Sequence, residues 1–264
     1  MEYMSKLTEK DEQQIYEELK GVIFLNPLYG YGNSSQSKYL TAEEYLSGNV
    51  REKLDIAKKT AELYPDDYTV NVEALQQVQP VDLTASEISV RLGATWLPVD
   101  IVQDFMFELF GTPKYCQWNI KTHYSEYTGE WNIEGKSYDR NNIKVNSTYG
   151  TAMVNGYKIY EDTLNLRDVR VFDYYDDENG KRVAVLNKKE TAIAQAKQEL
   201  IKSKFLEWIW KDPQRRERLC KLYNERFNSI RPREYDGSHL TFEGMNPEIT
   251  LKPHQRNAIA RTIY

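Results

Sequence analysis

The sequence predicts an α+β protein, and three features indicate this fold class. Amphipathic helical patterns fill residues 1–110. From Tyr115 the hydrophobic period shortens towards two, as it does in strands, so residues 111–187 are expected to form a small α+β region. Residues 188–233 return to the helical period with an excess of basic side chains. We therefore expect a helical N-terminal part, a small mixed or antiparallel sheet with hairpins, and a C-terminal basic helical pair.

Helices are expected early in the chain at Glu9–Leu19 and Tyr45–Tyr64, where apolar residues recur at helical spacing. The second of these helices is expected to end at Pro65-Asp66. A shorter helix, Val72–Val78, stops before Pro80.

A helix pair follows. Thr84-Ala85-Ser86-Glu87 is a capping-box pattern and predicts a helix that ends near Gly93, and a second helix is predicted over Val99–Phe110. Helix, glycine turn and helix suggest a DNA-reading helix-turn-helix, whose second helix needs Lys, Arg, Asn or Gln towards the bases. The second helix instead carries the acidic residues Asp100, Asp104 and Glu108. The pair is therefore expected to form core.

The middle region is expected to hold two hairpins around the turns Thr128-Gly129 and Asn179-Gly180, because Asn-Gly adopts positive φ readily. The flanking strands are Tyr115–Tyr124 with Glu130–Glu134, and Val169–Tyr175 with Lys181–Leu186. Between the hairpins, Ala152–Leu164 fits a helix packed on a sheet.

The basic pair begins where Asn187 caps a long helix, and Asp212-Pro213 starts the next one. Basic side chains recur along both helices with aromatic residues interleaved, which suits phosphate contacts and stacking on unpaired bases. Trp208 falls on the apolar stripe and is assigned to the core, whereas Trp210 lies off it. The DNA-binding candidates are Lys211, Arg215, Arg218, Trp210 and Arg226.

Charge supports this choice of region. The net charge of −5 combines a balance of −11 over residues 1–187 with +7 over residues 188–233. A basic block in an acidic chain is typical of phosphate contact. The alternative is that two solvated basic helices pack on an acidic body.

Composition limits the function classes. The 264 residues can bury the core of one large domain or two small ones. No apolar run approaches the roughly 18 residues of a membrane span, and the charged start excludes a signal peptide. Cys116 and Cys220 are too few for a disulfide framework or a zinc site. We expect a cytoplasmic protein with no membrane partner.

Two nucleotide-chemistry motifs are incomplete. Gly129–Ser137 places five residues between its glycines where a phosphate loop has four, and it alternates like a strand, so no ATP site is assigned there. Asn26-Pro27-Leu28-Tyr29 is near the Asn-Pro-Pro-Tyr motif of amino-methyltransferases, in which the Asn contacts a flipped base. Leu28 replaces the second proline, and no glycine-rich cofactor loop is present.

Catalytic and metal sites are not expected. Carboxylates suit hard cations, but on a hairpin tip they usually serve as solvated turn formers; the acidic residues concerned are Asp173, Asp176, Asp177 and Glu178. The three histidines are too dispersed for a triad or a metal site; they are His123, His239 and His254.

The final segment, Leu251–Tyr264, contains Leu-x-Pro-x-Gln followed by a short amphipathic helix. It resembles the adenine-reading segment that opens the motor of Swi/Snf-type superfamily-two helicases. A Gln amide donates and accepts at once, so it can pair with both N6 and N7 of adenine. The resemblance implies that Pro253 and Gln255 bind nucleotide only in a longer protein that uses ATP and Mg²⁺. We expect a fragment, with residues 234–264 as a truncated entrance to the motor.

Other segments extend the resemblance to one family, the large methylase–helicase proteins of conjugative elements and phages, similar to phage anti-restriction proteins. The segments are EYLSGNVREKL (Glu44–Leu54), SEISVRLGATWLP (Ser86–Pro98), YSEYTGEWNI (Tyr124–Ile133), EDTLNLRDVR (Glu161–Arg170) and RPREYDGSHL (Arg231–Leu240). In that family this stretch lies between an adenine-methylase region and the helicase motor. The resemblance implies DNA and the chain's own helicase and methylase domains as partners.

Three functions remain open. The leading hypothesis is a non-catalytic accessory module that engages DNA or positions the motor. The alternatives are a purely structural spacer between methylase and helicase, and a residual N6-adenine methyltransferase piece resting on Asn26 to Tyr29. A DNA module should show a contiguous positive face, and a spacer an apolar docking patch.

Overall fold

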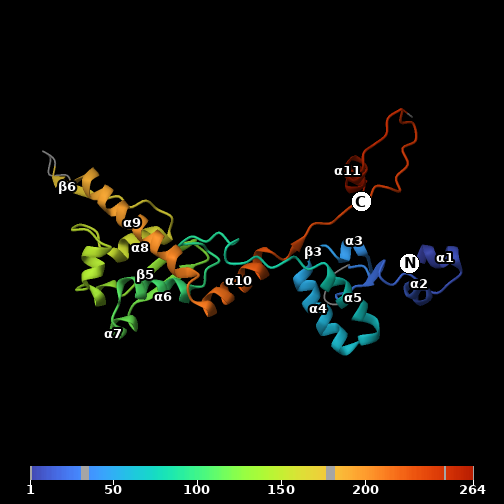
Figure 1. The fold of residues 1–264 in the computed structure, drawn as a ribbon, viewed down its shortest axis with the longest axis horizontal. Helices are drawn as coiled ribbons and strands as arrows, with labels where there is room; N and C mark the ends of the chain where they lie inside the picture. Colours follow the sequence, from blue (N-terminus) through green and yellow to red (C-terminus); the bar gives the residue numbers. More distant parts are fainter. Residues whose placement is uncertain (1, 31–35, 177–181, 247, 264) are drawn as a thin grey trace. The chain divides into compact units, whose positions relative to one another are not determined.

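The computed structural model describes residues 2–30, 36–176, 182–246 and 248–263. The chain is α+β, as predicted, with helices and short antiparallel two-stranded sheets (Figure 1). It folds as two compact units: residues 1–82 with 224–264 form unit 1, and residues 83–223 form unit 2. None of the described helices is long and apolar enough to cross a membrane.

Unit 1 is mostly helical. Its elements are α1 (Glu2–Thr8), α2 (Glu12–Glu18), β1 (Ile23–Leu25), β2 (Tyr39–Thr41), α3 (Ala42–Tyr45), β3 (Gly48–Asn49), α4 (Val50–Leu63), α5 (Pro65–Gln77), β8 (Ile230–Arg231) and α11 (Pro253–Ile263). β1 pairs antiparallel with β2, and β3 with β8. The core lies between β1, α3, α4 and α5, where the rings of Phe24 and Tyr45 stack with centroids 5.0 Å apart.

Pro65 starts a helix, which corrects the expectation that it only ends one. α4 ends at Leu63, and α5 begins directly at Pro65 and includes most of the shorter helix predicted over Val72–Val78. Proline is favoured at the first position of a helix, because the N–H that it lacks has no partner within the helix. Asp66 and Asp67 follow in the first turn, where carboxylates favour the positive end of the helix dipole.

Unit 2 contains the larger core. Its elements are α6 (Val99–Phe110), α7 (Lys114–Gln117), β4 (Lys121–Ser125), β5 (Glu130–Glu134), the 3-10 helix η1 (Lys136–Asp139), the π-helix η2 (Lys144–Thr148), α8 (Gly156–Leu164), β6 (Phe172–Asp176), β7 (Arg182–Leu186), α9 (Lys188–Ile209) and α10 (Pro213–Phe227). The boundary between the units falls within α10.

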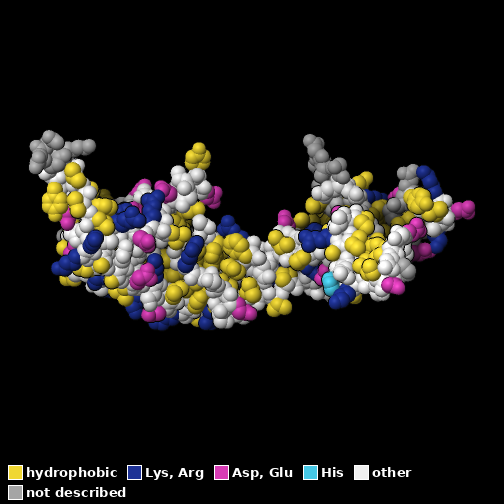
Figure 2. Space-filling view, turned by 90° about the horizontal axis from the view of Figure 1, so that it is seen from above, with side chains coloured by type: hydrophobic (Ala, Val, Ile, Leu, Met, Phe, Trp, Pro, Cys, Tyr) yellow, Lys and Arg dark blue, Asp and Glu magenta, His cyan; other side chains and the backbone are white. Residues whose placement is uncertain are grey.

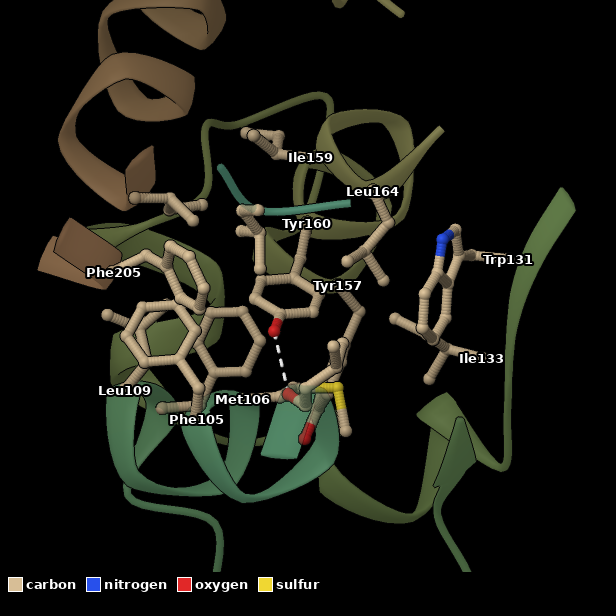
Figure 3. Close-up of a cluster of buried hydrophobic side chains, with 14 of the residues drawn as sticks. Phe105, Met106, Leu109, Trp131, Ile133, Tyr157, Ile159, Tyr160, Leu164 and Phe205 are labelled. Atoms are coloured by element: carbon tan, nitrogen blue, oxygen red, sulfur yellow. Dashed lines mark hydrogen bonds between the residues drawn. The ribbon is translucent and has the colours of Figure 1, made fainter. Parts of the chain in front are cut away.

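The core of unit 2 is built from α6, β5, α8 and α9 (Figure 3). Phe105 of α6 lies within 6.0 Å of the rings of Tyr160, Phe205 and Trp208. The Tyr160 hydroxyl donates to the Val102 carbonyl at 2.8 Å, so the polar atom of this fully buried ring is satisfied. The stripe of apolar residues in α6 therefore forms core, as the sequence indicated.

Side chains from the end of α8 and from α9 complete the hydrogen bonding of extended backbone in unit 2. The Asn165 side chain accepts from the Trp131 N–H at 2.8 Å and donates to the Trp131 carbonyl at 2.9 Å. In α9 the buried Gln198 donates to the Arg167 carbonyl at 2.7 Å. A strand edge leaves backbone groups unpaired, and these side chains pair them without a further strand.

Residues 84–93 form no helix, so the helix predicted from Thr84 to near Gly93 is wrong. One half of the capping box forms, since the Thr84 N–H donates to the Glu87 carboxylate at 2.9 Å. The Glu87 N–H donates to the Thr84 carbonyl and closes a single turn, after which the chain runs extended. In this extended segment every second residue is buried, as in a strand; the buried residues are Ile88, Val90 and Leu92. Gly93 has φ +88°, and a Cβ there would clash with the Leu164 carbonyl oxygen. The extended segment therefore packs directly on the end of α8.

Both predicted hairpins form, but their first strands are shorter than predicted. The helix α7 occupies the start of the predicted strand Tyr115–Tyr124, so β4 begins only at Lys121, and β6 begins at Phe172 rather than Val169. β4 pairs with β5 and β6 pairs with β7, each antiparallel over five residue pairs. β5 covers most of the segment that resembles a phosphate loop, which confirms that this segment is a strand. The Asn179-Gly180 turn lies outside the described residues.

Candidate nucleic-acid interface

Three lysines of unit 2 line one surface hollow of about 280 Å³. They come from three elements: Lys144 begins η2, Lys204 lies in α9, and Lys211 follows the end of α9. Two carboxylates also line the hollow, together with aromatic and aliphatic side chains. The remaining lining residues are Phe105, Glu108, Leu109, Tyr149, Glu207 and Trp208.

Two of these lysines keep their ammonium groups available. Within the described part of the chain, neither Lys144 nor Lys211 has an ion pair or side-chain hydrogen bond, and both are exposed. Lys204 instead donates to the Glu207 carboxylate at 2.8 Å, and this hydrogen bond raises the pKa of Lys204. The hollow thus presents two free cations and one paired cation. An anionic ligand could bind them without breaking an existing contact.

Lys144 was missed by sequence reasoning, and no local pattern could have found it. It begins a five-residue π-helix, a type of turn without its own sequence period. Its ammonium lies beside Gly111, the left-handed C-cap of α6, where the helix dipole favours a cation. Only tertiary packing brings this lysine to the end of α9.

Arg215 is held by the protein itself. Its guanidinium donates to the carbonyls of Ile209 at 2.9 Å and Trp208 at 2.6 Å, two of the last carbonyls of α9. It also lies over the Trp208 ring, 3.4 Å from the centroid. These contacts satisfy helix-end carbonyls that lack intrahelical donors. Arg215 is therefore placed to join α9 and α10.

Arg218 pairs with α6. Its guanidinium donates to both carboxylate oxygens of Asp100, at 2.5 Å and 3.2 Å. This contact holds the pKa of Asp100 below its usual value. Burial, and then the neighbouring Asp100 carboxylate, raise the pKa of Asp104. The acidic residues of α6, which make this helix unsuited to reading DNA, thus include one that pairs with a basic residue of α10.

The other two DNA-binding candidates lie in different surroundings. Trp210 is half-buried and packs against the core of unit 2. Arg226 belongs to the unit 1 part of α10, where its guanidinium lies 5.6 Å from the Phe227 ring centroid. The structure therefore brings Lys211 together with two other cations, but it does not join the five candidates in one site. Figure 2 likewise shows Lys and Arg side chains scattered among acidic and apolar ones on the visible face.

The Asn26–Tyr29 segment of unit 1 is a turn whose asparagine is occupied. The Asn26 side chain accepts from the Leu28 N–H at 3.0 Å and donates to the Ser37 carbonyl at 3.1 Å. It also donates to Gln36 at 3.1 Å. The amide that would contact a flipped base in a methyltransferase therefore stabilises the local loop. A hollow of about 390 Å³ adjoins this turn.

Gln255 and Pro253 lie at the start of α11. The Gln255 side-chain oxygen accepts from the Lys252 N–H at 2.9 Å, which caps the helix. Gly237 lies so close to the helix that a Cβ would clash with the Arg256 carbonyl oxygen, and its N–H donates to Asn257 at 3.0 Å. These contacts hold the helix, and hence Gln255, against residues of unit 1.

Of the four acidic residues at the second hairpin, Asp177 and Glu178 lie outside the described residues. Asp173 accepts a hydrogen bond from Asn187 at 2.9 Å, which links β6 to the start of α9. Among the described residues, no group of three or more His, Cys, Asp or Glu side chains could hold a metal ion.

Comparison with known families gives two matches. Residues 91–229 match the model of a domain of unknown function, DUF8437. Residues 1–33, which contain α1, α2 and β1, match the model of a probable helicase winged helix domain. The second match associates the chain with helicases. Comparisons with the curated proteins and with the solved structures found no match.

Proposed function

The chain belongs to the family of domains of unknown function DUF8437, and we propose that it serves a helicase as a non-catalytic module that engages DNA. The observation that carries the proposal is the convergence of Lys144, Lys204 and Lys211 on one hollow of unit 2. Two of these cations are free to neutralise phosphates, and phosphate neutralisation supplies most of the sequence-tolerant affinity for nucleic acid. The helicase winged-helix match at residues 1–33 supports the same class of partner.

We propose that the longer protein is a methylase–helicase, in which ATP and Mg²⁺ drive the motor and Gln255 contacts adenine. The support for this step is the resemblance of the five segments and of Leu251–Tyr264 to that family. The methyltransferase alternative receives no support from Asn26, because its amide is engaged in the local turn.

The structural spacer remains the second candidate, and one observation favours it. Arg215 and Arg218, two of the five DNA-binding candidates from the sequence, contact α9 and α6. Part of the basic block therefore serves packing within unit 2.

A salt titration separates the two functions. We expect binding of labelled DNA that is sequence-tolerant and micromolar or weaker. Replacing Lys144 and Lys211 together by alanine should flatten the slope of log affinity against log salt by nearly two units on duplex DNA, at about 0.9 per phosphate. The matched control is Lys58→Ala with Lys59→Ala, two exposed lysines of α4. No binding at low salt, or equal slopes for both double variants, would favour the spacer.

A further inference from the structure

We propose that the lysine-lined hollow of unit 2 takes a single-stranded nucleic acid, with one phosphate at Lys144, a second at Lys211 and a base against the aromatic wall. This inference rests on the proposed function and names the form of nucleic acid that the site accepts. Three features of the hollow carry it: its concave shape, its aromatic lining and its carboxylates.

The shape of the hollow fits single nucleotide units. At about 280 Å³ it lies near the lower end of pockets that bind small organic molecules. A duplex presents its phosphates on a broad convex surface and keeps its bases stacked inside. A single strand is flexible, so that one base and the two phosphates that flank it can reach a concavity while the neighbouring nucleotides remain outside.

The lining of the hollow combines cations with aromatic surface. Phe105 and Trp208 are buried beneath it, and Tyr149 is half-buried at its side. The Tyr149 ring is supported from behind by Phe110, with centroids 5.8 Å apart in an edge-on arrangement. An unpaired base has an exposed π-face that can stack on such a ring, whereas a paired base in a duplex does not.

Carboxylates in the hollow disfavour a duplex further. Glu207 is tied to Lys204, and Glu108 accepts a hydrogen bond from the Trp208 indole at 2.7 Å, so both are fixed in place. Duplex DNA carries about one negative charge per 1.7 Å of its axis, twice the density of one strand. The two phosphate rows of a duplex would be repelled by these carboxylates. A single strand can instead place its phosphates at the two free lysines.

The test uses the full chain and three labelled probes: a 15-nucleotide oligothymidine, the matching 15-base-pair duplex and an abasic strand of the same length. We expect the oligothymidine to bind at least about fivefold more tightly than either other probe at equal salt, the scale of one base–aromatic stack. Replacing Lys144 and Lys211 by alanine should flatten its salt slope by about 1.4, at about 0.7 per phosphate on single strands.

A ring-deleting variant tests the base contact directly. Tyr149→Leu keeps apolar volume but removes the ring, and it should weaken oligothymidine binding by about fivefold while leaving abasic-strand binding unchanged. Thermal melting of each variant verifies that the fold is retained. Equal or tighter duplex binding that still depends on the two lysines would overturn the single-strand inference and leave the proposed function standing. If the lysine variant changes no affinity, both fail.

Discussion

The guanidinium of Arg215 lies 3.4 Å from the centroid of the Trp208 ring and donates to the Trp208 carbonyl at 2.6 Å. One side chain of α10 thereby covers an aromatic residue of the core and satisfies the backbone at the end of α9. The Trp208 indole in turn donates to Glu108 of α6 at 2.7 Å. Three helices of unit 2 therefore meet at this tryptophan, and Arg215, one of the predicted DNA-binding residues, connects them.

Arg215→Ala should destabilise unit 2 without a direct effect on DNA. Loss of a cation–π contact and of charged hydrogen bonds to two carbonyls should lower the free energy of unfolding by about 1–3 kcal/mol. Arg215→Lys should recover only part of this loss, because an ammonium cannot reproduce the planar fork. Urea unfolding followed by tryptophan fluorescence measures both variants. The control Arg216→Ala removes an exposed neighbouring charge and should change stability by less than about 0.5 kcal/mol.

The Arg218–Asp100 pair should stabilise unit 2 only at pH values where Asp100 is ionised. Its folded-state pKa lies below the ordinary value of 3.8, so its contribution is present above that value and is lost as pH falls through the folded pKa. Both side chains are about half exposed, so the effect is small. Arg218→Ala should lower the melting temperature near pH 7 and match the parent chain near about pH 2. A difference that persists in acid would mean that Arg218 acts through packing.

Leu166→Gly should stabilise the protein, because Leu166 has φ +56° directly after α8. The helix ends there in hydrogen bonds from Leu166 to Thr163 and from Arg167 to Asp162, an arrangement that favours glycine. Relief of the left-handed backbone exceeds the entropy lost to glycine by about 0.5–1 kcal/mol, and the leucine is 57% exposed. Gly93→Ala is the opposite control. A Cβ there would clash with the Leu164 carbonyl oxygen, so thermal melting should show a loss of about 2 kcal/mol or more.

Sequence patterns predicted correctly those helices that have a strong apolar stripe or a capping side chain at their start. Val99–Phe110 and the helix after Asn187 were predicted at the residues where they occur, since a strong apolar stripe or a side-chain cap defines each. The helix expected after Thr84 failed because its capping contacts close a single turn, whereas the burial of alternate residues from Ile88 extends the chain. Packing against α8 therefore favours the strand-like period of two residues over the helical period in this segment.

The candidate site was predictable only in part. Lys211 follows a predicted helix end, so its exposure could be inferred from the helical stripe. Arg215 and Arg218 lie on the same predicted helix, but their partners are the end of α9 and a carboxylate 118 positions earlier in the chain. Helical spacing gives the direction of a side chain, not the residue that it meets. For the same reason Lys144 could not be joined to Lys211 from sequence.

In the proposed methylase–helicase, Gln255 should contribute to nucleotide binding. Its side-chain oxygen already accepts from the Lys252 N–H at 2.9 Å, but a carbonyl oxygen has two lone pairs and can also accept from adenine N6. The side-chain NH₂ would then donate to N7. Gln255→Ala should therefore weaken ATP binding by about 1–3 kcal/mol, the scale of a lost bidentate pair, in calorimetric titration.

Gln255→Glu separates this role from helix capping. A glutamate keeps the acceptor for Lys252 and so preserves the cap of α11, but its carboxylate cannot donate to adenine N7. If Gln255 contacts adenine, the Glu variant should bind ATP about as weakly as the Ala variant, while amide exchange in α11 stays at the level of the parent chain. If Gln255 only caps the helix, the Glu variant should bind ATP normally and the Ala variant alone should show faster exchange. That second pattern would refute the adenine contact.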